Sequence, residues 1–189
     1  MLFRSIQHFF FWFISVSFIF HKLCICNSSS SANIWWPWHC LHHHSLEEIQ
    51  PCPTSQYLGL FNASNNGNST NHILSIELDT IVSPEFQDID NNHAGINVNS
   101  LESVESAPAT YFSDQERNNI SLELTNGNPM HVWIDYDEIE KLLNVTPAPT
   151  SIPKPNRPLL STQIDLSQYL LESMYVGFSA STGAVTSDH

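Results

Sequence analysis

Residues whose side chains could bind a metal or catalyse a reaction gather between residue 77 and residue 93. It contains Glu77, Asp79, Asp88 and His93. On a β-strand, Glu77 and Asp79 would lie on one face, and the loop after them would bring Asp88 and His93 back toward that face. Carboxylate oxygens suit Ca²⁺ or Mn²⁺, and an imidazole favours a transition metal at one position. The spacing predicts a divalent-metal site, and a solvated acidic loop with a surface histidine is the alternative.

The same carboxylates could instead hydrolyse a glycosidic bond, one as nucleophile and the other as acid. Sandwich glycosidases with such a strand usually carry another Glu three residues beyond the Asp, where this chain has Val82. The sequence also contains no Gly-x-Ser-x-Gly, P-loop or kinase signature. We therefore expect that the chain is not an enzyme and contains no kinase domain.

These side chains would have to be positioned by strands, because most apolar runs in the sequence are short and several alternate with polar residues. Turn clusters at residues 65–68 and 126–129 and a Pro/Thr/Ser stretch at 146–158 separate the runs. Only residues 167–173 indicate a helical turn. The predicted strands are 57–61, 72–79, 93–99, 120–125, 131–136, 159–165 and 174–180. Short strands without long helices predict an all-β fold, an antiparallel sandwich of jelly-roll type.

The charge balance excludes two classes of partner. The 189 residues include 6 Lys and Arg against 19 Asp and Glu, which gives a formal net charge of −13. No basic stripe is present to neutralise phosphates, so we expect neither nucleic acid nor an anionic membrane surface as a partner. The length allows one globular domain.

The N-terminus resembles an export signal. Arg4 precedes an uncharged run of twelve residues, 9–20. As a helix this run would be about 18 Å long, short of a hydrocarbon core of about 30 Å. We predict a signal peptide over residues 1–26, cleaved after Cys26, and no membrane span in the mature chain. The alternative is an uncleaved signal anchor.

Glycosylation motifs point to the same compartment, since a secreted chain meets the glycosylation machinery. Asn-x-Ser/Thr sequons begin at Asn27, Asn62, Asn68, Asn119 and Asn144. All four cysteines precede residue 53, so the rest of the chain has no disulfide framework. We expect a secreted, extracellular glycoprotein.

Seven motifs in order resemble a known family. They are Gln56–Asn62, Glu77-x-Asp79-Thr80, Glu85-Phe-x-Asp88, Asn92–Ser100, Val132–Asp137, Pro158–Ser161 and Val176–Gly183. Together they resemble the legume-type lectin domain, in particular the extracellular domain of plant L-type lectin receptor kinases. The resemblance covers about Thr54 to His189.

The resemblance implies a two-sheet jelly roll that binds one Mn²⁺ and one Ca²⁺ in a single loop. The matching transition-metal ligands are Glu77, Asp79, Asp88 and His93. The matching calcium ligands are Asp79, the Ile81 carbonyl, Ser83 and Asp88. Family members often pair through a sheet edge, so the resemblance also implies a dimer of that kind.

The expected sugar site departs from the family at one residue. Where the family has an Asn that binds both calcium and the sugar, this chain has Ser83. A hydroxyl cannot present the fixed donor and acceptor of an amide. The resemblance also implies sugar contacts from backbone groups around Gly183 and Ala184.

The resemblance therefore predicts a non-catalytic, carbohydrate-binding, lectin-like ectodomain fragment with weak or lost affinity for monosaccharides. Its ligand would be a glycan or another apoplastic molecule. The alternative is an extracellular interaction module whose sugar site has decayed and which binds a protein or a small hydrophobic ligand.

The segment 27–53 carries none of the seven motifs. Read one base later, permitted codings of Trp35–His43 give Gly-Gly-His-Gly-Ile-Ala-Phe-Ile-Ile, the kind of strand that the lectin receptors place before the Tyr57 motif. We interpret 27–53 as an irregular, frame-shifted segment, with a genuine Trp-rich segment as the alternative. The lectin domain, residues 54–189, would then be partial and incomplete at both ends.

Overall fold

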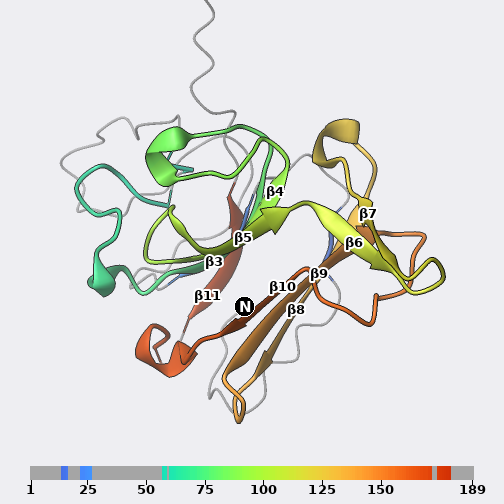
Figure 1. Ribbon diagram of the computed structural model, residues 1–189. Helices are drawn as coiled ribbons and strands as arrows, with labels where there is room; N and C mark the ends of the chain where they lie inside the picture. The colour runs from blue at the N-terminus through green and yellow to red at the C-terminus, as the bar shows by residue number, and fades with distance from the viewer. Residues whose placement is uncertain (1–13, 17–21, 27–56, 59, 172–173, 180–189) are drawn as a thin grey trace, which may run out of the picture.

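The computed structural model describes residues 14–16, 22–26, 57–58, 60–171 and 174–179. The strands within these ranges form three sheets, and every strand pair is antiparallel (Figure 1). The described residues include no α-helix, only four short 3₁₀ turns. The prediction of an all-β antiparallel sandwich is confirmed.

The largest sheet has five strands and carries the acidic residues. Its strands, in spatial order, are β11 (Tyr175–Ser179), β2 (Lys22–Cys26), β3 (Leu74–Asp79), β4 (His93–Val98) and β5 (Ser103–Pro108). The strands β3, β4 and β5 follow one another in the chain and pair as successive neighbours. This half of the sheet is therefore a meander built by local connections.

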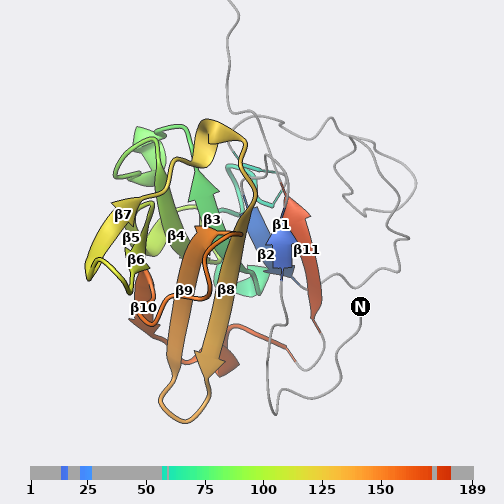
Figure 2. The ribbon, with the colours of Figure 1, turned by 90° about the vertical axis from the view of Figure 1, so that its right-hand side faces the viewer.

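A four-stranded sheet faces the first, and a small two-stranded sheet completes the fold (Figure 2). The four strands, in spatial order, are β1 (Ile14–Val16), β8 (Met130–Asp137), β9 (Leu142–Pro149) and β10 (Leu160–Gln163). The two-stranded sheet is β6 (Thr110–Ser113) with β7 (Asn118–Ser121). The 3₁₀ turns are η1 (Ser69–Asn71), η2 (Pro84–Phe86), η3 (Leu124–Asn126) and η4 (Leu166–Gln168).

The main core lies between the two large sheets. Alternate residues of each strand supply it, as the period of two requires. Its fully or nearly fully buried members are Leu74, Ile76, Ala94, Ile96, Ile134, Leu143, Val145, Leu160, Leu166 and Met174. Burial of these apolar side chains is the main force that holds the sheets together.

A second, smaller core anchors the loop that carries the acidic residues. It consists of Phe61, Ile73, Phe86 and Leu101. The rings of Tyr57 and Phe86 pack edge to face, with centroids 5.6 Å apart. Because Phe86 belongs to η2, the motif around residue 57 holds this turn against the sheet.

The predicted strand at 57–61 is wrong. Its described residues form a turn in which the backbone N–H groups of Leu60 and Phe61 donate to the Tyr57 carbonyl, at 3.0 and 3.3 Å. Leu58 has a φ of 56°, which a strand does not allow. These apolar residues pack in the second core and belong to no ladder, so a short apolar run did not indicate a strand here. The predicted strand at 120–125 is also wrong beyond Ser121, where the chain turns into η3.

The predicted loop at 146–158 begins too early, because β9 continues to Pro149. Proline is tolerated in a strand where its missing N–H has no ladder partner. Among the described residues, β10 pairs only with 142–145 of β9, while 146–149 pair with β8 alone. Pro147 and Pro149 therefore lie where β9 has one neighbour. The strands β5, β6 and β9 were not predicted from the sequence.

Two pieces of the predicted signal peptide lie in the sheets. β1 pairs with β8, and β2 pairs with both β3 and β11. The irregular segment 27–53 lies outside the described residues. The domain boundaries at 26 and 53 remain predictions. No helix in the described ranges has the length and apolar character needed to span a membrane.

Candidate metal centre

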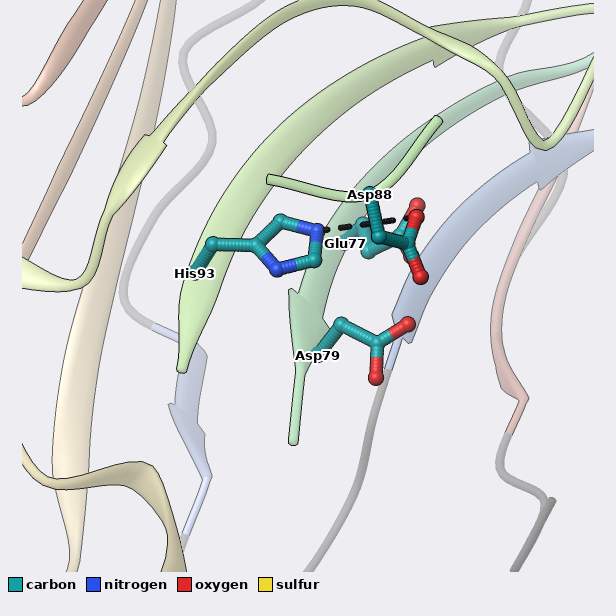
Figure 3. Close-up of side chains that lie close together, drawn as sticks. All are labelled: Glu77, Asp79, Asp88 and His93. Atoms are coloured by element: carbon teal, nitrogen blue, oxygen red, sulfur yellow. Dashed lines mark ion pairs between the residues drawn. The ribbon is translucent and has the colours of Figure 1, made fainter. Parts of the chain in front are cut away.

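The structure brings together the four residues that were predicted to bind a metal. Glu77 and Asp79 lie at the end of β3, His93 begins β4 directly opposite Asp79, and Asp88 returns from the loop between the strands. One ligand atom from each lies within 4.8 Å of the others. Figure 3 shows the four side chains gathered at one end of the two strands. Metal binding itself remains a prediction.

The protonation of His93 suits a metal ligand. Its Nδ1 lies 2.8 Å from the Asp90 carbonyl oxygen, and a carbonyl can only accept, so Nδ1 carries the proton. Nε2 then presents its lone pair on the side of Asp88, whose Oδ1 is 3.9 Å away. A backbone carbonyl that fixes the tautomer in this way is the usual support of a metal-binding histidine.

The loop between β3 and β4 is closed by its own carboxylates. The backbone N–H of Ile81 donates to Asp79 Oδ1 at 2.8 Å, and that of Ser83 donates to Asp88 Oδ2 at 2.7 Å. Pro84 starts the 3₁₀ turn η2, and the buried Phe86 fixes it to the second core. Two hydrogen bonds to carboxylates of the cluster and one buried ring therefore order this loop.

Burial raises the electrostatic energy of this cluster. Glu77 is 2% exposed, His93 is 1% exposed and the Asp88 side chain is 5% exposed. Three carboxylates this close repel one another, and burial removes the water that would screen them. A divalent cation would offset this repulsion. Carboxylate oxygens with one imidazole are a donor set that fits Mn²⁺, and the carboxylates fit Ca²⁺.

Of the remaining predicted site residues, some lie at this cluster and others are outside the described part. Ser83 is half-buried next to Asp88, and its side chain makes no capping hydrogen bond to η2. Ile81 is exposed in the same loop. Gly183 and Ala184 fall outside the described residues.

One contact at the cluster was missed from the sequence. The side-chain amide of Asn97, which is fully buried on β4, donates to Glu77 Oε2. The signal was present: His93, Gly95 and Asn97 alternate on one face of a strand, and a polar amide on an otherwise apolar strand interior calls for a buried partner.

The predicted glycosylation sites differ in their surroundings. Asn68 and Asn119 are exposed, whereas Asn62 and Asn144 are half-buried. The Asn144 Oδ1 accepts a hydrogen bond from Ser161 Oγ at 2.7 Å. Asn27 lies outside the described residues. Glycosylation at each of them remains a prediction.

Comparison with protein families agrees with the geometry. The sequence model of the legume lectin domain matches residues 41–189. The chain is 56% identical over 135 residues to an Arabidopsis thaliana protein named "Probable inactive L-type lectin-domain containing receptor kinase III.1", covering 71% of this chain and 22% of that protein. It is 53% identical over 135 residues to L-type lectin-domain containing receptor kinase IV.1 of the same plant, covering 71% of this chain and 20% of that protein. The chain spans about a fifth of the length of these relatives.

Solved structures share the fold. Lectin II from Ulex europaeus superposes with a TM-score of 0.58 at 22% identity, covering 96% of this chain and 61% of that chain. Lectin I-B4 from Griffonia simplicifolia, in a metal-free form, gives a TM-score of 0.57 at 24% identity with the same coverage. At this identity the agreement concerns the sandwich fold.

Proposed function

The chain belongs to the legume lectin domain family, and on that premise we propose that it is a non-catalytic module that binds carbohydrate through the loop between β3 and β4. The observation that carries the proposal is the convergence of Glu77, Asp79, Asp88 and His93 within 4.8 Å. The spacing of these residues along the chain predicts the same convergence.

We assign the metal ligands by residue. Glu77, Asp79, Asp88 and His93 would hold Mn²⁺, while Asp79, the Ile81 carbonyl, Ser83 and Asp88 would hold Ca²⁺. Bound cations would neutralise the buried carboxylates and hold the loop in one conformation. The chain's own contribution is the two backbone bonds to Asp79 and Asp88, which already order this loop. A shallow sugar site depends on such preorganisation, because ordering a loop on binding consumes affinity.

The sugar site itself should be weak. Ser83 stands at the centre of the loop, and its hydroxyl offers one donor where an amide offers two and a separate acceptor. Gly183 and Ala184 would supply backbone contacts to a sugar hydroxyl. We expect no measurable binding of free glucose or mannose, and a glycan larger than a monosaccharide as the better ligand.

We place the chain outside the cell, as a secreted glycoprotein or an ectodomain. Its support is the predicted leader over residues 1–26, the sequons and the similarity to receptor kinases of a plant. The proposed layout is a leader, a frame-shifted segment over 27–53 and a lectin domain over 54–189. A dimer through a sheet edge is part of the same proposal, and sedimentation at several concentrations tests it.

A second function is favoured by the surface next to Ser83. Ile81, Val82 and Ile89, all in the same loop, are 41%, 44% and 47% exposed. Exposed apolar side chains at a binding loop suit an apolar ligand. A peanut lectin structure with a nine-residue peptide shares the fold at a TM-score of 0.55 and 21% identity. An interaction module that binds a protein or a small hydrophobic ligand is therefore the runner-up.

One experiment separates these functions. The full chain is applied to a glycan array, first with Ca²⁺ and Mn²⁺ and then with chelator. Binding of an oligosaccharide that chelator removes supports the lectin. The interaction module is supported by two results together. The chain gives no glycan signal in either buffer, and it binds a hydrophobic dye without metal, whereas the Val82→Asp variant does not.

A further inference from the structure

A buried chain of polar side chains leads from β5 across β4 to Glu77. Ser103 Oγ donates to Asn97 Oδ1 at 2.5 Å, and Asn97 Nδ2 donates to Glu77 Oε2. The Leu101 carbonyl lies 3.5 Å from the same Nδ2. Asn97 is 0% and Glu77 is 2% exposed. Water therefore does not replace these bonds when one of them is lost.

The donor and acceptor in each of these hydrogen bonds follow from the chemistry of the Asn97 amide. A hydroxyl can donate to the amide oxygen, while a carboxylate can only accept from the amide nitrogen. The Glu77 carboxylate therefore fixes which end of the Asn97 amide faces it, and the Ser103 hydroxyl, which can donate or accept, donates to the amide oxygen that remains. Asn97 satisfies one carboxylate oxygen without adding a negative charge to a site that already holds three carboxylates.

A β-bulge brings Ser103 close to Asn97. The register between β4 and β5 shifts between Ile96 and Asn97, so Ser103 lies opposite Asn97 and Val104 is left out. Val104 is 54% exposed, as expected for the extra residue of a bulge. The bulge thus aims a hydroxyl at the buried amide.

Gly95 provides the room for that hydroxyl. It lies directly opposite Glu77 in the β3–β4 ladder. A Cβ at this position would overlap Ser103 Oγ and would push the hydroxyl away from Asn97. A glycine inside a strand costs stability, so its presence here is accounted for by the close approach of Ser103.

We propose that Asn97 is a positioning residue of the metal centre, which holds the Glu77 carboxylate in the orientation that a cation needs, and that the Ser103 hydroxyl supports the Asn97 amide in this position. The proposal rests on the metal centre assigned above. Groups that orient a metal ligand typically change metal affinity 10–100-fold when they are removed. Neither residue touches the metal in this arrangement.

The test measures Mn²⁺ affinity directly, from the electron paramagnetic resonance signal of free Mn²⁺ titrated into the chelator-treated full chain. Asn97→Leu keeps the approximate size of the side chain and removes its hydrogen bonds. We expect Mn²⁺ affinity to fall about 10–100-fold. Ser103→Ala removes only the hydrogen bond that supports the Asn97 amide, and we expect a smaller fall in the same direction.

Two matched controls separate positioning from general destabilisation. Asn99 is also a buried asparagine, but its amide bonds to the backbone of Ile73 and Ser69 and not to the cluster. Asn99→Leu should lower the melting temperature and leave Mn²⁺ affinity unchanged. Ser75 faces Asn97 across the β3–β4 ladder, and its buried hydroxyl has no partner among the described residues. Ser75→Ala should change neither quantity.

The outcomes are distinct. Wild-type affinity in Ser103→Ala and in Asn97→Leu overturns the positioning role while the metal centre stands, and so does an equal loss of affinity in Asn99→Leu. If Asn97→Leu does not fold, Ser103→Ala against Ser75→Ala decides the question alone. A wild-type chain that binds no Mn²⁺ overturns the metal centre and the positioning role together.

Discussion

The five-stranded sheet is assembled in different ways on the two sides of β3. On one side, β3, β4 and β5 are consecutive in the chain, and the metal cluster and its polar support lie on them. On the other side, β2 lies between β3 and β11, so segments from opposite ends of the chain pair with each other. The first side is specified by local connections, and the second depends on distant segments meeting.

The difference has an energetic and a functional consequence. Local pairing closes short loops and costs little chain entropy, whereas distant pairing must close most of the chain first. The side with local pairing can therefore hold the site even when its neighbour is poorly supported. The other side is where the fold is vulnerable.

The vulnerable side also includes the predicted leader. β2 spans Lys22–Cys26, and cleavage after Cys26 would remove it. The slot between β3 and β11 would then need another strand. The segment 27–53, read in the shifted frame, would supply an apolar strand from the mature chain, so leader cleavage and the frame-shift interpretation support each other.

The largest expected effect comes from removing β2. A chain that starts at Asn27 lacks the partner of β3 and β11, and with β1 that of β8, and we expect it to lose most of the roughly 5–15 kcal/mol that holds a typical domain together. Thermal unfolding followed by circular dichroism, with size-exclusion chromatography, measures this.

Two matched chains control for the deletion. One starts at Lys22 and keeps β2, and it should melt cooperatively. The other starts at Asn27 with the frame restored upstream of Tyr57, and it should regain a cooperative transition. A monomeric, cooperatively melting chain from Asn27 in the present frame would show that the slot needs no strand.

A core substitution sharpens the comparison on the local side. Ile96 on β4 is 0% exposed and belongs to the main core, so Ile96→Ala should cost about 2–5 kcal/mol of unfolding free energy. Ile139, in the turn between β8 and β9, is 90% exposed, and Ile139→Ala should stay within about 0.5 kcal/mol. Urea denaturation measures both. Equal costs would mean that β4 is not packed as described.

Metal binding should stabilise the side of the sheet formed by β3, β4 and β5, which carries the cluster. At a free-metal concentration about 100 times the Kd, linkage adds about 2.7 kcal/mol to the free energy of unfolding. Asp88→Asn removes a ligand charge, so its melting temperature should no longer respond to Mn²⁺ and Ca²⁺. Melting scans with metal and with chelator measure the response.

The control for Asp88→Asn is Glu116→Gln, a charge removed from the exposed connection between β6 and β7. This variant should keep the full metal response. An unmodified chain whose melting temperature ignores chelator would favour the solvated acidic loop over the metal site.

The smallest effect concerns the sugar. Ser83→Asn would add one hydrogen bond to a ligand, worth about 0.5–1.5 kcal/mol, and so should raise affinity by up to about tenfold. In the chain with the frame restored upstream of Tyr57, we expect mannose or glucose binding to become detectable by titration calorimetry. Tight monosaccharide binding by the unmodified chain would contradict the assignment of Ser83.

Two strands and the convergence of the acidic cluster follow from the residue pattern. Alternation in 73–79 and 132–136 predicted β3 and β8, because one face of each strand packs on the core. The spacing of Glu77, Asp79, Asp88 and His93 predicted their convergence, because two ligands share a strand face and the others return through one short loop. Both features depend on residues that are near one another in the sequence, so alternation and spacing can predict them.

Three other features depend on contacts between segments that are distant in the sequence. Pro147 and Pro149 could join β9 because β10 stops short of them, and a residue pattern does not state where a neighbouring strand ends. Ser103 reached Asn97 only through the bulge that leaves out Val104. The place of Lys22–Cys26 between β3 and β11 depends on which distant segments pair. Strand pairing is set by hydrogen bonds and packing between segments far apart in the chain, and local sequence carries no record of that choice.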